Sequence, residues 1–175
     1  NGQSDSNGIQ FSRRELYGMV LSRLGTRLPG REIDEMIESL DSLFLELPPT
    51  LLDGDTASRL RTMRSAARTV SLTSNTAFVS GATLRKTLDS LGLGDAFDYL
   101  LFSDEEGAAK PSMRLMAKVL AHPRCGASNP TEVLHIGDNA RADGEGARRA
   151  GYQFMLYDPS DKMDWDGLMR RISTE

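Results

Sequence analysis

The feature that most constrains the fold of this chain is an alternation of short apolar segments with helical patterns through its second half. The apolar segments, interpreted as strands, are residues 69–73, 97–102, 133–136 and 152–157. The helical patterns are residues 56–67, 78–91, 111–121, 139–150 and 164–172. Strands that alternate with helices form βαβ units, which place parallel strands in one sheet with helices on both faces. We therefore predict an α/β fold for residues 48–175.

Two amphipathic helical patterns precede this region and predict a small helical hairpin over residues 9–47. Ser12 is placed to cap the first helix, with Glu15 three residues later as its capping-box partner. Gly25 ends this helix, and the second is expected over residues 29–45.

The hairpin is bounded by segments that do not suit a helix. Residues 1–8 are polar and glycine-rich, which predicts a flexible tail or loop. Pro48 and Pro49 interrupt the helical pattern at the other end. We therefore place the boundary between the hairpin and the α/β region after residue 47.

Composition argues against several classes of protein. The 175 residues contain 21 Lys and Arg against 25 Asp and Glu, a net charge of −4, whereas nucleic-acid-binding domains usually carry a basic surface. One cysteine excludes an internal disulfide framework. No apolar run reaches the roughly 18 residues of a membrane span, and no signal-peptide pattern is present. We expect a cytoplasmic protein that binds neither nucleic acid nor membrane, and, because the chain begins with Asn1 and not Met, a processed or truncated product.

Polar residues follow the first two predicted strands, and ligands of such folds bind where the strands end. Ser74 and Asn75 follow the first strand. The free N–H groups of the next helix would favour an anion such as phosphate there; alternatively, these residues only cap that helix. Lys110 precedes Pro111 at a helix start, where the helix dipole disfavours a cation. It either offsets anionic charge in a site or is a solvated surface lysine.

Two carboxylates follow the third predicted strand. Asp138 ends that strand, and Asp143 lies about a turn and a half further on. Oxygen ligands of this kind suit Mg²⁺. The alternative is that Asp138 or Asn139 caps the helix and Asp143 is a surface charge near its N-terminus. Taken together, polar residues at three successive strand ends favour a functional site.

Three segments of the chain resemble the motifs of a known family. Residues 72–76, 107–111 and 135–147 resemble motifs II, III and IV of the haloacid dehalogenase (HAD) superfamily. Residues 91–98, together with Ala150 and Gly151, match the surroundings of those motifs. The resemblance covers about residues 48–158, and the helical hairpin resembles the inserted cap of the helical-cap group.

The resemblance implies a fold and a mechanism. The fold would be a HAD-like Rossmannoid parallel sheet with helices on both faces, plus the helical cap. Ser74, Asn75 and Lys110 would bind phosphate, with Lys110 also stabilising the nucleophile and the transferred phosphoryl charge. Asp138 would bind Mg²⁺, and Asp143 would support Lys110 or act at the metal.

Motif I of the family is not found. It is a strand ending in Asp-x-Asp that supplies the nucleophile and should precede the cap. Asp53-Gly54-Asp55 is a candidate, but Pro48 and Pro49 leave room for only a stub of strand before it. The spacing to Thr56 also departs from the family pattern. We interpret Asp53 or Asp55 as a helix cap, with a nucleophilic role as the less favoured alternative.

The missing motif has a structural consequence. In the family its strand lies in the middle of the sheet, between the strands that end in motifs II and IV. Without it the sheet would contain a gap lined by unpaired backbone groups, which are costly to bury. We expect an absent N-terminal segment or a partner chain to fill this gap, and residues 49–53 are the least favoured candidate.

The leading functional prediction is a Mg²⁺-dependent phosphatase that acts on a small phosphorylated metabolite. It would work through an aspartyl-phosphate intermediate, with the nucleophilic aspartate outside the given chain. One alternative is a catalytically inactive HAD-like binding or scaffold domain. The other is hydrolysis of 2-haloacids by the same superfamily. The substrate itself is not readable, because the cap selects it.

Overall fold

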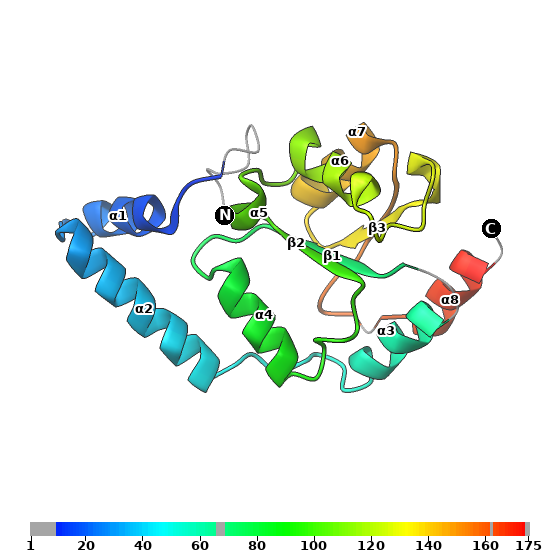
Figure 1. Ribbon diagram of the computed structural model, residues 1–175, viewed down its shortest axis with the longest axis horizontal. Coiled ribbons are helices and arrows are strands. Elements are labelled where there is room, and N and C mark those ends of the chain that lie inside the picture. Colours follow the sequence, from blue (N-terminus) through cyan, green and yellow to red (C-terminus); the bar gives the residue numbers. More distant parts are fainter. Residues whose placement is uncertain (1–9, 66–68, 162, 174–175) are drawn as a thin grey trace.

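The computed structural model describes residues 10–65, 69–161 and 163–173 (Figure 1). The predicted tail at residues 1–8 lies outside the described residues. In chain order the elements are α1 (Arg13–Arg23), α2 (Gly30–Glu46), α3 (Thr56–Ser65), β1 (Ser71–Ser74), α4 (Gly81–Ser90), β2 (Tyr99–Phe102), α5 (Ser103–Glu106), α6 (Met113–Ala121), η1 (Pro130–Glu132), β3 (Leu134–Gly137), η2 (Ala140–Glu145), α7 (Gly146–Ala150), β4 (Gln153–Leu156) and α8 (Trp165–Ser173). The predicted alternation of strands and helices is confirmed.

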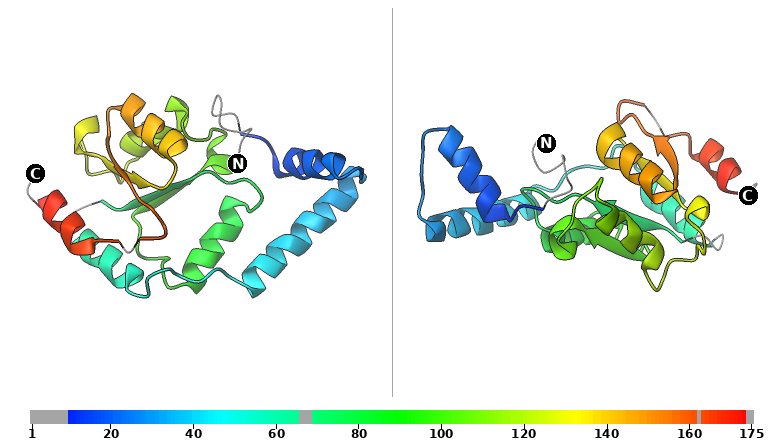
Figure 2. Two further views of the ribbon diagram at one scale, coloured as in Figure 1. Left: turned by 180° about the vertical axis from the view of Figure 1, so that it is seen from behind. Right: turned by 90° about the horizontal axis from the view of Figure 1, so that it is seen from above.

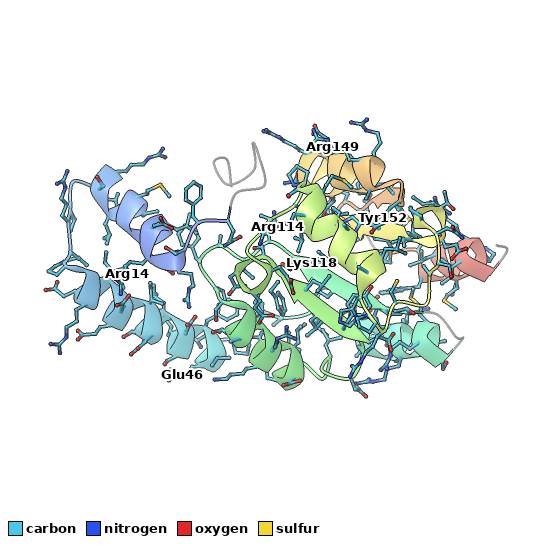
Figure 3. The ribbon with its side chains drawn as sticks, turned by 45° about the horizontal axis from the view of Figure 1, so that its top comes forward. Arg14, Glu46, Arg114, Lys118, Arg149 and Tyr152 are labelled. Atoms are coloured by element: carbon cyan, nitrogen blue, oxygen red, sulfur yellow. The ribbon has the colours of Figure 1, made fainter. Side chains whose placement is uncertain are left out.

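Helices α1 and α2 form a hairpin that extends to one side of the strands (Figures 1 and 2). The predicted capping box at Ser12 and Glu15 is present, and the chain turns at Gly25, whose φ is +75°. In Figure 3, Arg14 lies on the hairpin at the left, whereas Arg149 lies on α7 at the top of the view, right of the centre.

The strands form two separate parallel pairs. Strand β1 pairs with β2, and β3 pairs with β4. Val70 O accepts a hydrogen bond from Asp98 N, at the start of β2. The backbone N–H and C=O groups of residues 70, 72 and 74 therefore point toward β2. Because alternate residues of a parallel strand face opposite edges, Ser71 and Thr73 face the other edge of β1. In the second pair, Tyr157 N donates to Gly137 O, so the backbone groups of residue 137 point toward β4. Those of Leu134 and Ile136 therefore point to the opposite edge of β3, away from β4.

Helices pack on both faces of the β1–β2 pair, as predicted. Tyr99 and Leu101 of β2 share a buried cluster with Leu115 and Met116 of α6. The alternate residue Phe102 faces α4, where a side chain at Gly81 would overlap it. The α6 cluster also includes residues of α7 and the adjoining Tyr152, so apolar packing joins the two strand pairs although no ladder does.

Several helix boundaries differ from the sequence prediction for local reasons. Helix α4 begins at Gly81 and not at residue 78, because the Ser80 hydroxyl accepts from Thr83 N. Helix α6 begins at Met113, with Ser112 and not Pro111 at its start. The segment expected to be a loop after β2 contains the short helix α5.

The helix predicted over residues 139–150 starts with the wider turn η2. Both Asp143 N and Gly144 N donate to Asn139 O, and Asn139 Oδ1 accepts from Arg141 N and Ala142 N. A wide turn of this kind is frequent at functional sites. Among the described residues, no helix combines the length and the apolar character needed to cross a membrane.

Candidate active site

A polar cavity of about 200 Å³ lies where β1 and β3 end. Its lining includes the five site residues that the sequence predicts from the strand ends. These residues are Ser74, Asn75, Lys110, Asp138 and Asp143. Tertiary structure therefore brings together side chains that are up to 69 positions apart in the chain, between 74 and 143.

Lys110 is a buried cation in this cavity and not a surface lysine. Its side chain is 11% exposed. Its Nζ donates to Thr73 O at 2.8 Å and to Asp143 Oδ1 at 2.6 Å. An ammonium group has three N–H donors, and the described residues accept two of them, so within the described part of the chain one is available to an anion in the cavity.

Asp143 is held by donors on both of its oxygens. Oδ1 accepts from Lys110 Nζ and from His135 Nε2, the latter at 2.8 Å, and Oδ2 accepts from Asn139 N at 3.1 Å. Burial alone would raise the pKa of Asp143, but hydrogen bonding from His135 and the charge of Lys110 outweigh it and lower this pKa to about 2. The carboxyl group lies against Gly137, where any side chain would overlap it.

Asn75 binds the backbone of Lys110. Its Oδ1 accepts from Lys110 N at 2.7 Å, and its Nδ2 donates to Lys110 O at 3.0 Å. Both ends of the amide are thus engaged with a single residue. In this geometry the side chain fixes the peptide that carries the lysine, while its predicted contact with phosphate stays a prediction.

The loop after β1 is braced by residues that the sequence interpretation missed. Thr76 N donates to the buried Ser103 Oγ at 2.8 Å, and Thr76 Oγ1 donates to Asp104 Oδ1 at 2.7 Å. Asp104 also accepts from Gly81 N at 3.0 Å. Their position directly after β2 is the signal that would have identified them. These contacts hold Ser74 at the cavity wall.

Gln10 is a second cavity residue that the sequence interpretation missed. It precedes α1 and donates from Nε2 to Thr76 O at 3.1 Å. This contact links the segment that precedes α1 to the loop that follows β1. No motif marks Gln10, because the contact joins residues 66 positions apart.

Asp138 is the cavity carboxylate that would suit a metal ion. It is exposed and lies at the end of β3, whereas both oxygens of Asp143 are occupied by protein donors. Mg²⁺ often uses one or two carboxylates together with water and phosphate oxygens. Asp138 fits one such position, but within the described part of the chain no cluster of three metal-binding side chains is found.

Asp53 and Asp55 lie outside the cavity. Asp53 Oδ1 accepts from Asp55 N, and its Oδ2 accepts from Trp165 Nε1 of α8, each at 2.9 Å. Asp55 O accepts from Arg59 N, the first bond of α3. The structure shows no strand at residues 49–53. Helix α3, which begins directly after Asp55, and helix α8, which begins at Trp165, lie at the end of the molecule away from α1 (Figure 1).

The fold and the site define the class of protein. Residues 13–151 match the family model described as haloacid dehalogenase-like hydrolase. The chain belongs to this family of hydrolases.

Among curated relatives, a ribulose-1,5-bisphosphate 5-phosphatase of Halopiger xanaduensis is 35% identical over 50% of this chain and 36% of its own length. A pyrimidine 5'-nucleotidase of Escherichia coli is 29% identical over 86% of this chain and 60% of its own length. The chain thus spans less than two thirds of either relative.

Solved structures show the same fold at lower identity. A magnesium-bound HAD-type hydrolase from Bacillus subtilis has a TM-score of 0.62 and 19% identity, covering 89% of this chain and 69% of its own. An L-2-haloacid dehalogenase from Xanthobacter autotrophicus, with chloropropionic acid covalently bound, has a TM-score of 0.59 and 21% identity, covering 92% and 58%.

Proposed function

We propose that the protein is a Mg²⁺-dependent phosphatase for a small phosphate monoester, with its nucleophilic aspartate outside the described residues. The observation that carries this proposal is the buried ammonium of Lys110, which keeps one N–H donor for an anion in a polar cavity. Both named curated relatives are, by their names, phosphate-releasing enzymes.

The residues present suit phosphoryl transfer. Ser74 lines the cavity, where its hydroxyl would donate to a phosphoryl oxygen, and the remaining N–H of Lys110 would oppose the negative charge of the transferred group. A bound Mg²⁺ would neutralise phosphate charge, with Asp138 as one ligand.

The reaction then needs a carboxylate nucleophile. Its oxygen forms a bond to phosphorus while the ester P–O bond breaks, and the leaving alkoxide takes a proton. Water next attacks the phosphorus of the acyl phosphate, which releases inorganic phosphate and restores the carboxylate.

The interrupted sheet supports a nucleophile on an additional strand. Within the described part of the chain, one edge of β1 and one edge of β3 have no partner strand, and Lys110 Nζ bonds both Thr73 O on that edge of β1 and Asp143, which follows β3. One parallel strand between these edges would pair the backbone groups of Ser71, Thr73, Leu134 and Ile136. Its carboxyl end would reach the cavity. We propose that a segment preceding the hairpin or a partner chain supplies it.

The test uses the full-length gene product and a panel of phosphate monoesters. We expect phosphate release that requires Mg²⁺ and is abolished by a chelator. Lys110→Ala should lower kcat at least 100-fold, whereas Lys118→Ala, which removes a half-exposed lysine paired with Glu106, should stay within twofold.

Three other results would contradict the proposal. Absence of phosphate release from every ester would do so, and binding without turnover would then favour a scaffold domain. Chelator-insensitive release of chloride from 2-chloropropionate would instead favour dehalogenation, for which the covalent complex of the Xanthobacter autotrophicus structure is the supporting observation.

A further inference from the structure

His135 is the polar residue of an otherwise apolar strand, and its ring lies at the candidate site. Its side chain is 12% exposed, and burial of an imidazole is costly unless the ring is hydrogen-bonded. Its Nε2 lies 2.8 Å from Asp143 Oδ1. An ionised carboxylate only accepts hydrogen bonds, so the ring presents Nε2–H to Asp143.

The same oxygen of Asp143 receives Lys110. Nζ of Lys110 and Nε2 of His135 converge on Oδ1, at 2.6 and 2.8 Å. Asn139 N holds the other oxygen, Oδ2. A carboxylate with donors on both oxygens cannot rotate about its side-chain bonds, so the plane of the Asp143 carboxylate is fixed by His135 on one side and by backbone on the other.

We propose that His135 is a positioning residue that holds Lys110 in place through Asp143. The ring stands on β3, a regular strand paired along its length with β4, whereas Asp143 lies in the wide turn η2 and Lys110 lies in the loop before α6. Positioning by a residue on a rigid element gives a site more precision than loop residues provide alone.

The kinetic consequence rests on the proposed phosphatase function. If Lys110 opposes charge that develops in the transition state, its displacement lowers kcat more than it raises KM. A role of His135 in packing alone would lower stability and leave the kcat of the folded enzyme unchanged.

Two substitutions separate these roles in the full-length gene product. The amide nitrogen of glutamine reaches roughly the position of Nε2, and that of asparagine reaches roughly the position of Nδ1. We expect His135→Asn to lower kcat at least tenfold with KM within threefold, and His135→Gln to retain at least a third of kcat. His122→Asn is the matched control, since this histidine stacks on Tyr99 outside the cavity.

A second measurement needs no activity. In wild-type protein labelled with ¹⁵N, the Nε2–H of His135 should give a slowly exchanging, downfield signal, and the Lys110 ammonium should also be visible. His135→Asn should remove the first signal and shift or broaden the second. His135→Gln and His122→Asn should leave the Lys110 signal in place.

The outcomes are distinct. Equal kcat in the Asn and Gln variants, absence of a protected His135 ring N–H in wild type, or an unchanged Lys110 ammonium signal in His135→Asn would each overturn the positioning role. Absence of phosphatase activity in wild type would refute the proposed function instead, while the spectra would still test the contact.

Discussion

Lys110 and Asp143 form an ion pair in which both side chains are nearly removed from solvent, at 11% and 4% exposure. Such a pair contributes little net stability over apolar packing, but removal of one partner leaves the other charge buried and typically costs about 3–5 kcal/mol. The pair is therefore sensitive to the loss of either charge. Its retention in a polar cavity is consistent with a chemical role.

The depressed pKa of Asp143 predicts a defined pH dependence of stability. Folding lowers the pKa of the Asp143 carboxyl from 3.8 to about 2. The ionised group therefore stabilises the native state at pH values above 3.8, its pKa in the unfolded chain. This stabilisation is lost as the pH falls to the pKa of the folded state. The contribution is about 2 kcal/mol. We expect wild-type unfolding free energy, measured in urea, to fall by this amount between about pH 4 and pH 2 on account of this group.

Asp143→Asn should be about 3 kcal/mol less stable than wild type at pH 7, because Lys110 loses its counter-charge. It should also lack the contribution of this group between pH 4 and pH 2. Asp166→Asn is the control, since that side chain is 80% exposed and should change stability by less than about 0.5 kcal/mol. Equal stability of the two variants at pH 7 would refute the assignment.

At the scale of elements, the hairpin contacts the α/β unit through α2, which packs against α4, and through one side of α1. Arg13 donates two bonds to Asp41 of α2, both at 2.7 Å, and a third from Nε to Phe78 O at 3.1 Å. Arg14, the next residue, pairs with Asp34 on the exposed side. Of these two arginines, Arg13 alone connects α1 both to α2 and to the loop that contains Phe78.

Arg13→Ala should therefore destabilise the protein by about 1–2 kcal/mol, since it removes charged hydrogen bonds that are mostly out of solvent. Arg14→Ala should cost less than about 0.5 kcal/mol, as exposed ion pairs do. Urea unfolding gives the free energies, and hydrogen exchange of α1 amides gives the local effect. Equal losses in the two variants would show that the contact with Phe78 O does not hold the hairpin.

Element boundaries show what local sequence predicts well. The capping pattern at Ser12 and Glu15 placed the start of α1 correctly, because a capping box involves only neighbouring residues. Pro111 misplaced the start of α6 by two residues, because Ser112 provides the cap. The Asn139 cap of η2 is a local feature, but the wide turn itself was not predicted, since Asp143 also bonds Lys110 from a distant loop.

At the scale of the whole molecule, the two strand pairs are joined by apolar packing around α6 and α7 and by the Lys110 contacts. Among the described residues, one edge of β1 and one edge of β3 have no partner strand. Long free edges with unpaired N–H and C=O groups are templates for pairing with another strand. We propose that the interrupted sheet accepts a further strand at these edges.

Hydrogen exchange tests this arrangement. In the 175-residue chain alone, the amides of Ser71, Thr73, Leu134 and Ile136 should exchange freely, whereas the amide of Leu72, which faces β2, should be protected. In the full-length gene product we expect all five to be protected, with exchange of the first four slowed at least tenfold. Fast exchange of those four in both proteins would refute a strand in the gap.

The sequence by itself determined the α/β class, the strand order along the chain and the family motifs, because these depend on residue periodicity and on short spacings. It also placed Ser74, Lys110 and Asp138 at strand ends. Only the tertiary structure decided that Lys110 is buried, that Asn75 holds its backbone, and that His135 and Lys110 share one oxygen of Asp143. Those features depend on contacts between residues that are distant in the chain, and their energies arise from removal of charges from water, which no local pattern encodes.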